Sequence, residues 1–247
     1  MARLRAPDGC PWDREQTFDS IKQYTLEETY EVLDAIERRD WEHLSEELGD
    51  FLLQAVFYSQ MAAEAGLFRV DDALDAIAEK LVRRHPHVFE DAIAKTPDDV
   101  KKRWDEIKAE EKKGKAAGGL LDGVPKVLPA LMEAQQLTDK AARVGFDWRT
   151  AEEVIAKLHE ELGELAEARV GDSREKLQGE IGDLLFVLVN LSRFLKIDAE
   201  QALRGTNAKF RRRFGYVEQE LAKRGTAPAA ATIDEMEALW QEAKRHE

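Results

Sequence analysis

Residues 27–50, EETYEVLDAIERRDWEHLSEELGD, and residues 160–183, EELGELAEARVGDSREKLQGEIGD, carry the same five acidic residues at the same spacing. Each stretch begins with Glu-Glu-x-x-Glu, continues for fifteen residues, and ends with Glu-x-x-Asp. Every acid of the second set lies 133 positions after its counterpart, about half of the 247-residue chain. The repeat predicts two copies of one structural unit, related by internal duplication.

Apolar residues recur at helical spacing along nearly the whole chain, and the alternation typical of strands is nearly absent. In the first half we expect helices over residues 18–38, 41–65 and 70–84, and a fourth that begins at Thr96-Pro97. In the second half we expect helices over residues 152–170, 174–195 and 198–220, and a last one that opens with the capping box Thr232-x-x-Glu235. The predicted fold class is all-α, with two tandem helical-bundle domains of four helices each.

The stretch EEKKGKAAGG at residues 110–119 is first charged and then small and flexible, as interdomain linkers are. We therefore expect an N-terminal helical domain at residues 1–110, a linker at 111–119 and a C-terminal helical domain at 120–247.

The charge balance limits the class of partner. Fifty acidic residues against 37 basic ones give a net charge of −13, which argues against general affinity for DNA or RNA. A nucleotide ligand stays open, because a bound divalent metal reverses the local charge. Cys10 is the single cysteine, so no intramolecular disulfide and no cysteine-based zinc site can form. No signal peptide is visible, and the longest apolar run, residues 184–195, is too short to span a bilayer. We expect a cytoplasmic protein with no membrane partner.

The acids predict a metal site in each copy. Carboxylates at i and i+3 share one helix face, and two such helices joined by a turn bring their acids together. Ionised carboxylates gather in this way when a cation holds them, and oxygen-only ligands suit Mg²⁺ or Mn²⁺. The predicted ligands are Glu28, Glu31, Glu47 and Asp50 in the first copy, and Glu161, Glu164, Glu180 and Asp183 in the second.

The acidic residues allow two other interpretations. The first is a solvated acidic helix face, which the repetition at equal spacing disfavours. The second is a di-iron carboxylate bundle, which needs Glu-x-x-His pairs. None of the five histidines has a glutamate three residues before it, so the sequence disfavours iron.

Basic and aromatic residues repeat in step with the acids. The pairs Lys80/Arg84 and Lys209/Arg213 stand at i and i+4, and beside a metal cluster such a pair suits the remaining charge of a polyphosphate. An ordinary surface row of salt bridges is the alternative.

The pairs Trp104/Lys108 and Trp240/Lys244 each place an indole and an ammonium one turn apart. The indole could stack on a base while the ammonium reaches a phosphate, and the alternative is a tryptophan that anchors a helix to the core. Lys176 lies one turn before Glu180 and its counterpart in the first copy is His43, the clearest difference between the two candidate sites.

Several phosphate-binding and nucleophile motifs are absent from the sequence. There is no Walker motif, no Gly-x-Gly-x-x-Gly after a strand and no Gly-x-Ser-x-Gly elbow. Any phosphate chemistry must therefore use a metal and basic side chains rather than a glycine-rich loop.

These motifs resemble those of the all-α nucleoside triphosphate pyrophosphohydrolases, in the duplicated form of the MazG family. The resemblance covers nearly the whole chain. It is carried by the two acidic motifs and by GCPWD (9–13), YTLEETYEVLDAI (24–36), ELGD (47–50), RRHPHVF (83–89), VGFDW (144–148) and GDLLF (182–186).

The resemblance implies Mg²⁺-dependent hydrolysis of a nucleoside triphosphate to the monophosphate and pyrophosphate, broad specificity with a house-cleaning role, and a homodimer. It makes the C-terminal copy the better catalytic candidate, with Glu161, Glu164, Glu180 and Asp183 as its metal ligands, although the first copy keeps all of its acids. For metal-assisted hydrolysis we expect Glu160 or Glu161 to take the proton from water. The resemblance also implies nucleotide contacts from Lys176, Lys209, Arg213, Trp240 and Lys244. A non-catalytic nucleotide or alarmone sensor and a purely structural helical dimer are the alternatives.

Overall fold

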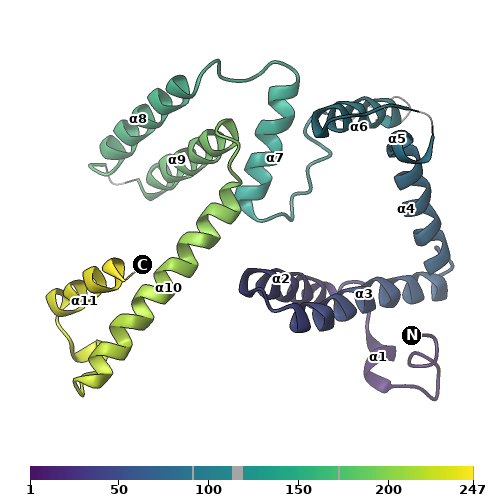
Figure 1. The fold of residues 1–247 in the computed structure, drawn as a ribbon, viewed down its shortest axis with the longest axis horizontal. Coiled ribbons are helices and arrows are strands. Elements are labelled where there is room, and N and C mark those ends of the chain that lie inside the picture. The colour runs from purple at the N-terminus through teal and green to yellow at the C-terminus, as the bar shows by residue number, and fades with distance from the viewer. Residues whose placement is uncertain (91, 113–118, 172, 247) are drawn as a thin grey trace. The chain divides into compact units, whose positions relative to one another are not determined.

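The computed structural model describes residues 1–90, 92–112, 119–171 and 173–246. Over these residues the regular structure is helical and contains no strand, which confirms the all-α fold class. The chain divides into two compact units, Met1–Lys115 and Ala116–Glu247 (Figure 1). Most of the predicted linker at 111–119 lies outside the described residues, so the domain limits stay a prediction.

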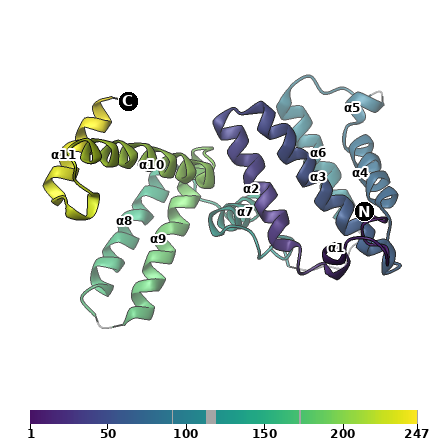
Figure 2. The same cartoon turned by 90° about the horizontal axis from the view of Figure 1, so that it is seen from below.

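The first unit contains six helices in its described residues. They are α1 (Pro11–Glu15), α2 (Lys22–Arg38), α3 (Trp41–Glu64), α4 (Val70–Arg84), α5 (Pro86–Phe89) and α6 (Pro97–Lys112). Helices α2 and α3 form an antiparallel pair, α4 packs against α3, and α6 packs against α4 (Figure 2). A small apolar cluster of Ile21, Phe57 and Met61 is buried where α3 meets the start of α2.

The reversal between α2 and α3 follows from two residues. Arg39 adopts the left-handed conformation with φ 57°, and Asp40 caps α3 by accepting a hydrogen bond from the His43 N–H at 3.2 Å. The predicted helix start at Phe18 was wrong, because Thr17 and Ser20 bond each other's backbone N–H groups at 2.9 and 3.2 Å. Such side-chain bonds compete with helical ones, and α2 begins only at Lys22.

In its described part the second unit contains α7 (Ala130–Arg143), α8 (Ala151–Ala168), α9 (Arg174–Phe194), α10 (Ala199–Lys223), the short 3₁₀ turn η1 (Pro228–Ala230) and α11 (Ile233–Arg245). Helices α8 and α9 form an antiparallel pair that corresponds to α2 and α3, with α7 against α9 and α11 against α10 (Figure 1). The capping box is present: Thr232 accepts from the Glu235 N–H, and Glu235 accepts from the Thr232 N–H.

The described residues of this unit form five α-helices rather than the four that the sequence predicted, and the additional helix is α7. Its apolar residues Leu131, Ala134 and Leu137 do recur at helical spacing, so the period was present in the sequence. What the sequence lacks is a start signal, because Pro129 stands at the N-cap without a side-chain cap. Helix α10 also runs three residues past its predicted end, to Lys223.

Both helix pairs leave large apolar side chains exposed in regular rows. Leu48, Leu52 and Val56 follow one another at every fourth residue of α3, and Leu52 is 64% exposed. On α9 the row includes Leu185 and Leu188, and Leu185 is 50% exposed. Rows of this kind exceed the scattered apolar exposure of a typical monomer surface. None of the described helices has the length and apolar character needed to cross a membrane.

Candidate active site

The acidic cluster of the second copy is formed by α8 and α9. Glu161 and Glu164 stand one turn apart on α8, Glu180 lies opposite on α9, and one carboxylate oxygen from each lies within 4.8 Å of the others. Glu161 is only 4% exposed. Burial, and next the charge of Glu161, raise the pKa of Glu164 above its ordinary value, because the ionised forms repel one another.

Lys157 is a member of this site that the sequence reasoning missed. It lies one turn before Glu161, and its Nζ is 2.7 Å from Glu160 Oε1 and 2.7 Å from Glu161 Oε1. These contacts, with Glu160 first, raise the pKa of Lys157 above its ordinary value. The i, i+4 spacing from Lys157 to Glu161 was the available signal. The corresponding residue of the first copy, 133 positions earlier, is Tyr24.

The first copy builds a similar cluster on α2 and α3. Carboxylate oxygens of Glu28, Glu47 and Asp50 lie within 4.8 Å of one another. Burial, followed by the neighbouring charge of Glu31, raises the pKa of Glu47, so Glu31 lies beside the group. His43, which replaces Lys176 here, places its Nε2 3.2 Å from Glu47 Oε1.

Each copy therefore gathers three of its four predicted ligands, but the residue outside the tight group differs. In the first copy it is Glu31, and in the second it is Asp183, which lies one turn past Glu180 on α9. Both clusters thus consist of three carboxylates from two paired helices, and they differ in which of the four predicted ligands lies outside.

The residues present fit a hard divalent cation. The donor set in both clusters consists of carboxylate oxygens only, as Mg²⁺ and Mn²⁺ prefer. In the second cluster, Oε2 of Glu161 is buried and has no hydrogen-bond partner among the described residues. A buried carboxylate oxygen without a partner is costly, and a cation ligated by Glu161, Glu164 and Glu180 would remove that cost.

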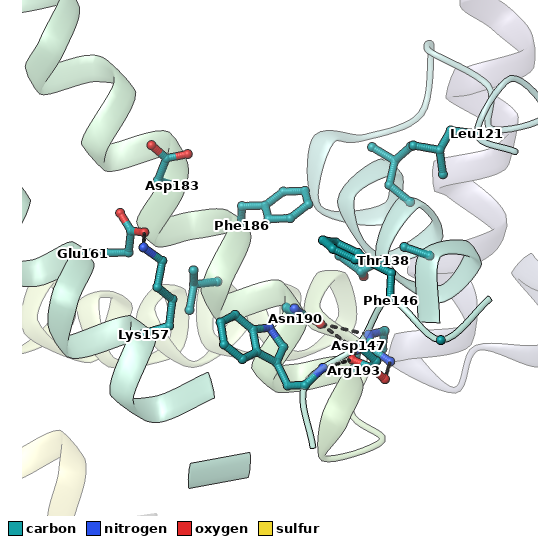
Figure 3. Close-up of a pocket in the computed structure, with 15 residues that line it drawn as sticks. Leu121, Thr138, Phe146, Asp147, Lys157, Glu161, Asp183, Phe186, Asn190 and Arg193 are labelled. Carbon is teal, nitrogen blue, oxygen red and sulfur yellow. Dashed lines mark hydrogen bonds and ion pairs between the residues drawn. The ribbon is translucent and has the colours of Figure 1, made fainter. Parts of the chain in front are cut away.

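A pocket of about 630 Å³ adjoins the second cluster. We call it the α7–α9 pocket, because its lining comes from α7, α8, α9, Leu121 and the segment 145–148. Glu161, Asp183 and Lys157 lie at one end of it, and Asn190, Asp147 and Arg193 at the other (Figure 3). Aromatic rings contribute to its wall, from Phe146, Trp148 and Phe186. The pocket thus joins an acidic end to an aromatic and polar end.

The predicted nucleotide contacts of the second copy lie on several elements. Lys176 is exposed in the first turn of α9, whereas Lys209 and Arg213 lie on α10 and Lys244 is exposed near the end of α11. The Trp240 ring lies 5.1 Å from the Phe210 ring, and the Arg213 guanidinium lies 5.7 Å from Trp240. Trp240 also packs against the buried cluster of α10 and α11. The residues that line the α7–α9 pocket include none from α10 or α11, and the nucleotide contacts of Lys209, Arg213, Trp240 and Lys244 stay predictions.

The corresponding basic residues of the first copy have partners within their own unit. Arg84 and Arg83 both bind the Glu111 carboxylate and lower its pKa to about 2. Lys108 lies over the Trp104 ring at 5.4 Å, while Lys80 is exposed on α4.

Comparisons with known proteins agree with this arrangement. The MazG nucleotide pyrophosphohydrolase domain matches the chain twice, at residues 16–89 and 149–217, and each match contains one acidic cluster. A nucleoside triphosphate pyrophosphohydrolase of Escherichia coli K12 is 52% identical over 250 residues, covering 100% of this chain and 95% of the relative.

A nucleoside triphosphate pyrophosphohydrolase/pyrophosphatase MazG of Thermotoga maritima is 45% identical over 244 residues, covering 99% of this chain and 92% of the relative. Bacillus subtilis YabN is 47% identical over 248 residues, which is 100% of this chain but 50% of that longer protein. The chain belongs to the MazG family of nucleotide pyrophosphohydrolases and carries the family's domain twice.

Proposed function

We propose that this protein hydrolyses nucleoside triphosphates to nucleoside monophosphates and pyrophosphate, and that the second copy performs the reaction. The observation that carries the proposal is the α7–α9 pocket beside the Glu161–Glu164–Glu180 cluster. One end offers carboxylates for a metal that binds phosphates, and the other offers rings and polar groups for a nucleoside. The relatives from E. coli and T. maritima bear names that describe this activity.

Glu161, Glu164 and Glu180 would hold Mg²⁺, with Asp183 at the pocket side of the cluster; Mn²⁺ could replace it. When bound, the ion supplies charge neutralisation at the phosphate oxygens and lowers the pKa of a bound water. The chain's own groups then have defined tasks. Lys157 and the predicted contacts Lys176, Lys209 and Arg213 neutralise the triphosphate, while the aromatic wall binds the base and excludes water.

The chemical step is a displacement at the α-phosphorus. The water oxygen bonds to that phosphorus, the bond from the α-phosphorus to the bridging oxygen of the β-phosphate breaks, and pyrophosphate leaves. The water proton passes to Glu160, which is exposed beside the cluster and held in place by Lys157 at 2.7 Å. Glu161 belongs to the cluster that would hold the cation, so Glu160 is the better placed of the two to take the proton.

The first copy lacks three features of the second. In the first copy, His43 occupies the position of Lys176, Tyr24 the position of Lys157, and Phe57 the position of Asn190. Phe57 is 4% exposed and packs with Ile21 and Met61, so it contributes to an apolar core. These differences favour catalysis in the second copy and a binding or structural role for the first.

The exposed rows on α3 and α9 support a homodimer. Leu52 and Leu185 are exposed on their helix pairs. Covering such side chains stabilises the protein by about 25 cal/mol per Å² of apolar surface removed from water. We propose that a second copy of the chain covers these rows and completes a helical bundle. A cytoplasmic location and a house-cleaning role toward several nucleotides complete the proposal.

The test is pyrophosphate release from a panel of nucleoside triphosphates, with and without Mg²⁺. We expect Mg²⁺-dependent release together with the nucleoside monophosphate. Glu164→Gln should abolish turnover, and the matched Glu31→Gln in the first copy should leave most of it. Full activity in the double variant would refute the assignment. Tight nucleotide binding without pyrophosphate release in the wild type would favour the sensor instead.

A further inference from the structure

The end of the α7–α9 pocket farthest from the acids contains a fixed network of three polar side chains. Arg193 Nη1 donates to Asp147 Oδ2 at 3.1 Å, and Nη2 donates to Asp147 Oδ1. The same guanidinium donates from Nε and Nη2 to Asn190 Oδ1 at 3.0 and 2.7 Å. The Arg193 contact lowers the pKa of Asp147 below its ordinary value, so this carboxylate is charged. Figure 3 shows the network as dashed lines.

This network fixes which way the Asn190 amide faces. A guanidinium has only donors, so Asn190 must turn its oxygen toward Arg193. The NH₂ group then points away from the arginine. Across the described residues, no hydrogen bond donated by the Asn190 amide is recorded, although the side chain lines the pocket. Asn190 therefore presents two N–H donors whose orientation Arg193 and Asp147 maintain.

The position of Asn190 along α9 suits contact with a base. It lies seven residues after Asp183, two helical turns on the same face, which is about 10 Å along the axis. With the phosphates at the acidic cluster, the ribose and base extend over this distance along the helix. The edge of the base then reaches Asn190 while its faces meet the aromatic wall.

We propose that Asn190 is a specificity-determining residue, which donates a hydrogen bond to a carbonyl oxygen on the substrate base. The proposal rests on the proposed function and adds a preference to it: uracil and the 6-oxopurines are favoured over cytosine and adenine, which carry an amino group at the corresponding position. An amino group would meet the amide donors of Asn190 and leave both sides unpaired. Arg193 and Asp147 are positioning residues that act through Asn190.

The first copy offers a natural contrast. Its residues at the positions of Asn190 and Arg193 are Phe57 and Gln60, and Gln60 donates to Glu64 on its own helix at 2.9 Å. No equivalent of the Arg193 network can form from these residues. The donor therefore belongs to the copy that we propose to be catalytic.

The experiment compares kcat/KM for UTP with CTP, and for ITP with ATP, in the full-length chain with Mg²⁺. Within each pair the bases differ at the group that Asn190 would read. We expect the wild type to favour UTP and ITP by about tenfold. Asn190→Asp replaces the donor by a second acceptor while keeping an oxygen toward Arg193, so both ratios should fall by about tenfold or more. Asn190→Ala should bring them toward one.

Three controls separate the possible outcomes. Ser192→Ala should leave the ratios unchanged, because the Ser192 hydroxyl is on the same helix and donates to the Leu188 carbonyl oxygen. Arg193→Met should lower the ratios as Asn190→Ala does, because it frees the amide to rotate. A ratio does not depend on the fraction of active enzyme, so partial misfolding does not obscure the result. Wild-type ratios that persist in Asn190→Asp would overturn the proposal.

Equilibrium binding of UTP and CTP by calorimetry, in Ca²⁺ in place of Mg²⁺, reads the same preference without turnover. If the wild type released no pyrophosphate but bound UTP more tightly than CTP, and Asn190→Asp removed that difference, the proposed hydrolysis would fail while the role of Asn190 stood. If the wild type released pyrophosphate but bound UTP and CTP equally and gave equal kcat/KM for both, the role of Asn190 would fail while the proposed hydrolysis stood.

Discussion

Replacing Trp148 by alanine removes the largest ring from the wall of the α7–α9 pocket. Stacking of a base on an aromatic side chain contributes about 1–3 kcal/mol when measured by alanine substitution. Trp148 is 37% exposed, so part of its surface stays in water and the lower part of that range applies. A loss of about 1–2 kcal/mol lowers kcat/KM for a nucleoside triphosphate by roughly 5-fold to 30-fold.

The assay compares a substrate that has a base with a ligand that lacks one. Steady-state pyrophosphate release gives kcat/KM for the nucleotide, and inhibition by tripolyphosphate gives a Ki for the phosphate end of the site. Trp148→Ala should lower the first and leave the second unchanged, because Glu161, Glu164 and Glu180 are untouched. Trp41→Ala, an exposed tryptophan of the first unit, is the matched control. Unaltered kcat/KM in Trp148→Ala, or an equal loss of tripolyphosphate binding, would refute the reasoning.

Three further predictions concern stability and assembly. Arg84 and Arg83 lower the pKa of Glu111 from 4.5 to about 2, so the stabilising contribution of Glu111 is present above pH 4.5 and is lost as the pH falls toward 2. In urea unfolding, Glu111→Gln should have a lower free energy of unfolding than the wild type at pH 7, and this difference should vanish near pH 2. A difference that does not change with pH would count against the ion pairs. Leu185→Lys should convert the homodimer into a monomer of 28.1 kDa, measured by light scattering. Val170→Lys, at a turn residue that is 89% exposed, should leave the dimer intact. An unchanged mass in Leu185→Lys would argue against the proposed dimer face. Thr232→Ala removes the cap of α11 and should cost about 1 kcal/mol of unfolding free energy, and no measurable loss would mean that the capping box contributes little.

Local signals in the sequence were sufficient for most helices. The helix start at Thr96-Pro97 and the capping box at Thr232 act over a few residues and can be recognised without knowing the rest of the fold. The α7 helix lacks such a local start signal, because Pro129 stands at its N-cap without a side-chain cap, and its place in the fold depends on packing against α9.

The acidic residues were also predictable, because the i, i+3 spacing on each helix and the repeat bring them to one level. The α7–α9 pocket was not, because its parts are far apart in the sequence. Asp147 and Arg193 are 46 residues apart, and only the packing of the 145–148 segment against α9 brings them into contact. Base stacking on Trp240 stays a prediction: spacing places Trp240 beside Lys244, and within this protomer its ring contacts Phe210.

We propose that a divalent cation joins the carboxylates of the second copy to a triphosphate. A crystal structure with Mn²⁺ and a nucleoside triphosphate analogue that cannot be cleaved between the α- and β-phosphates tests it most directly. We expect an anomalous peak at coordinating distance, about 2.1 Å, from Glu161, Glu164 and Glu180, with the base in the α7–α9 pocket beside Asn190. A peak elsewhere, or a nucleotide bound with its phosphates away from these three residues, would contradict it.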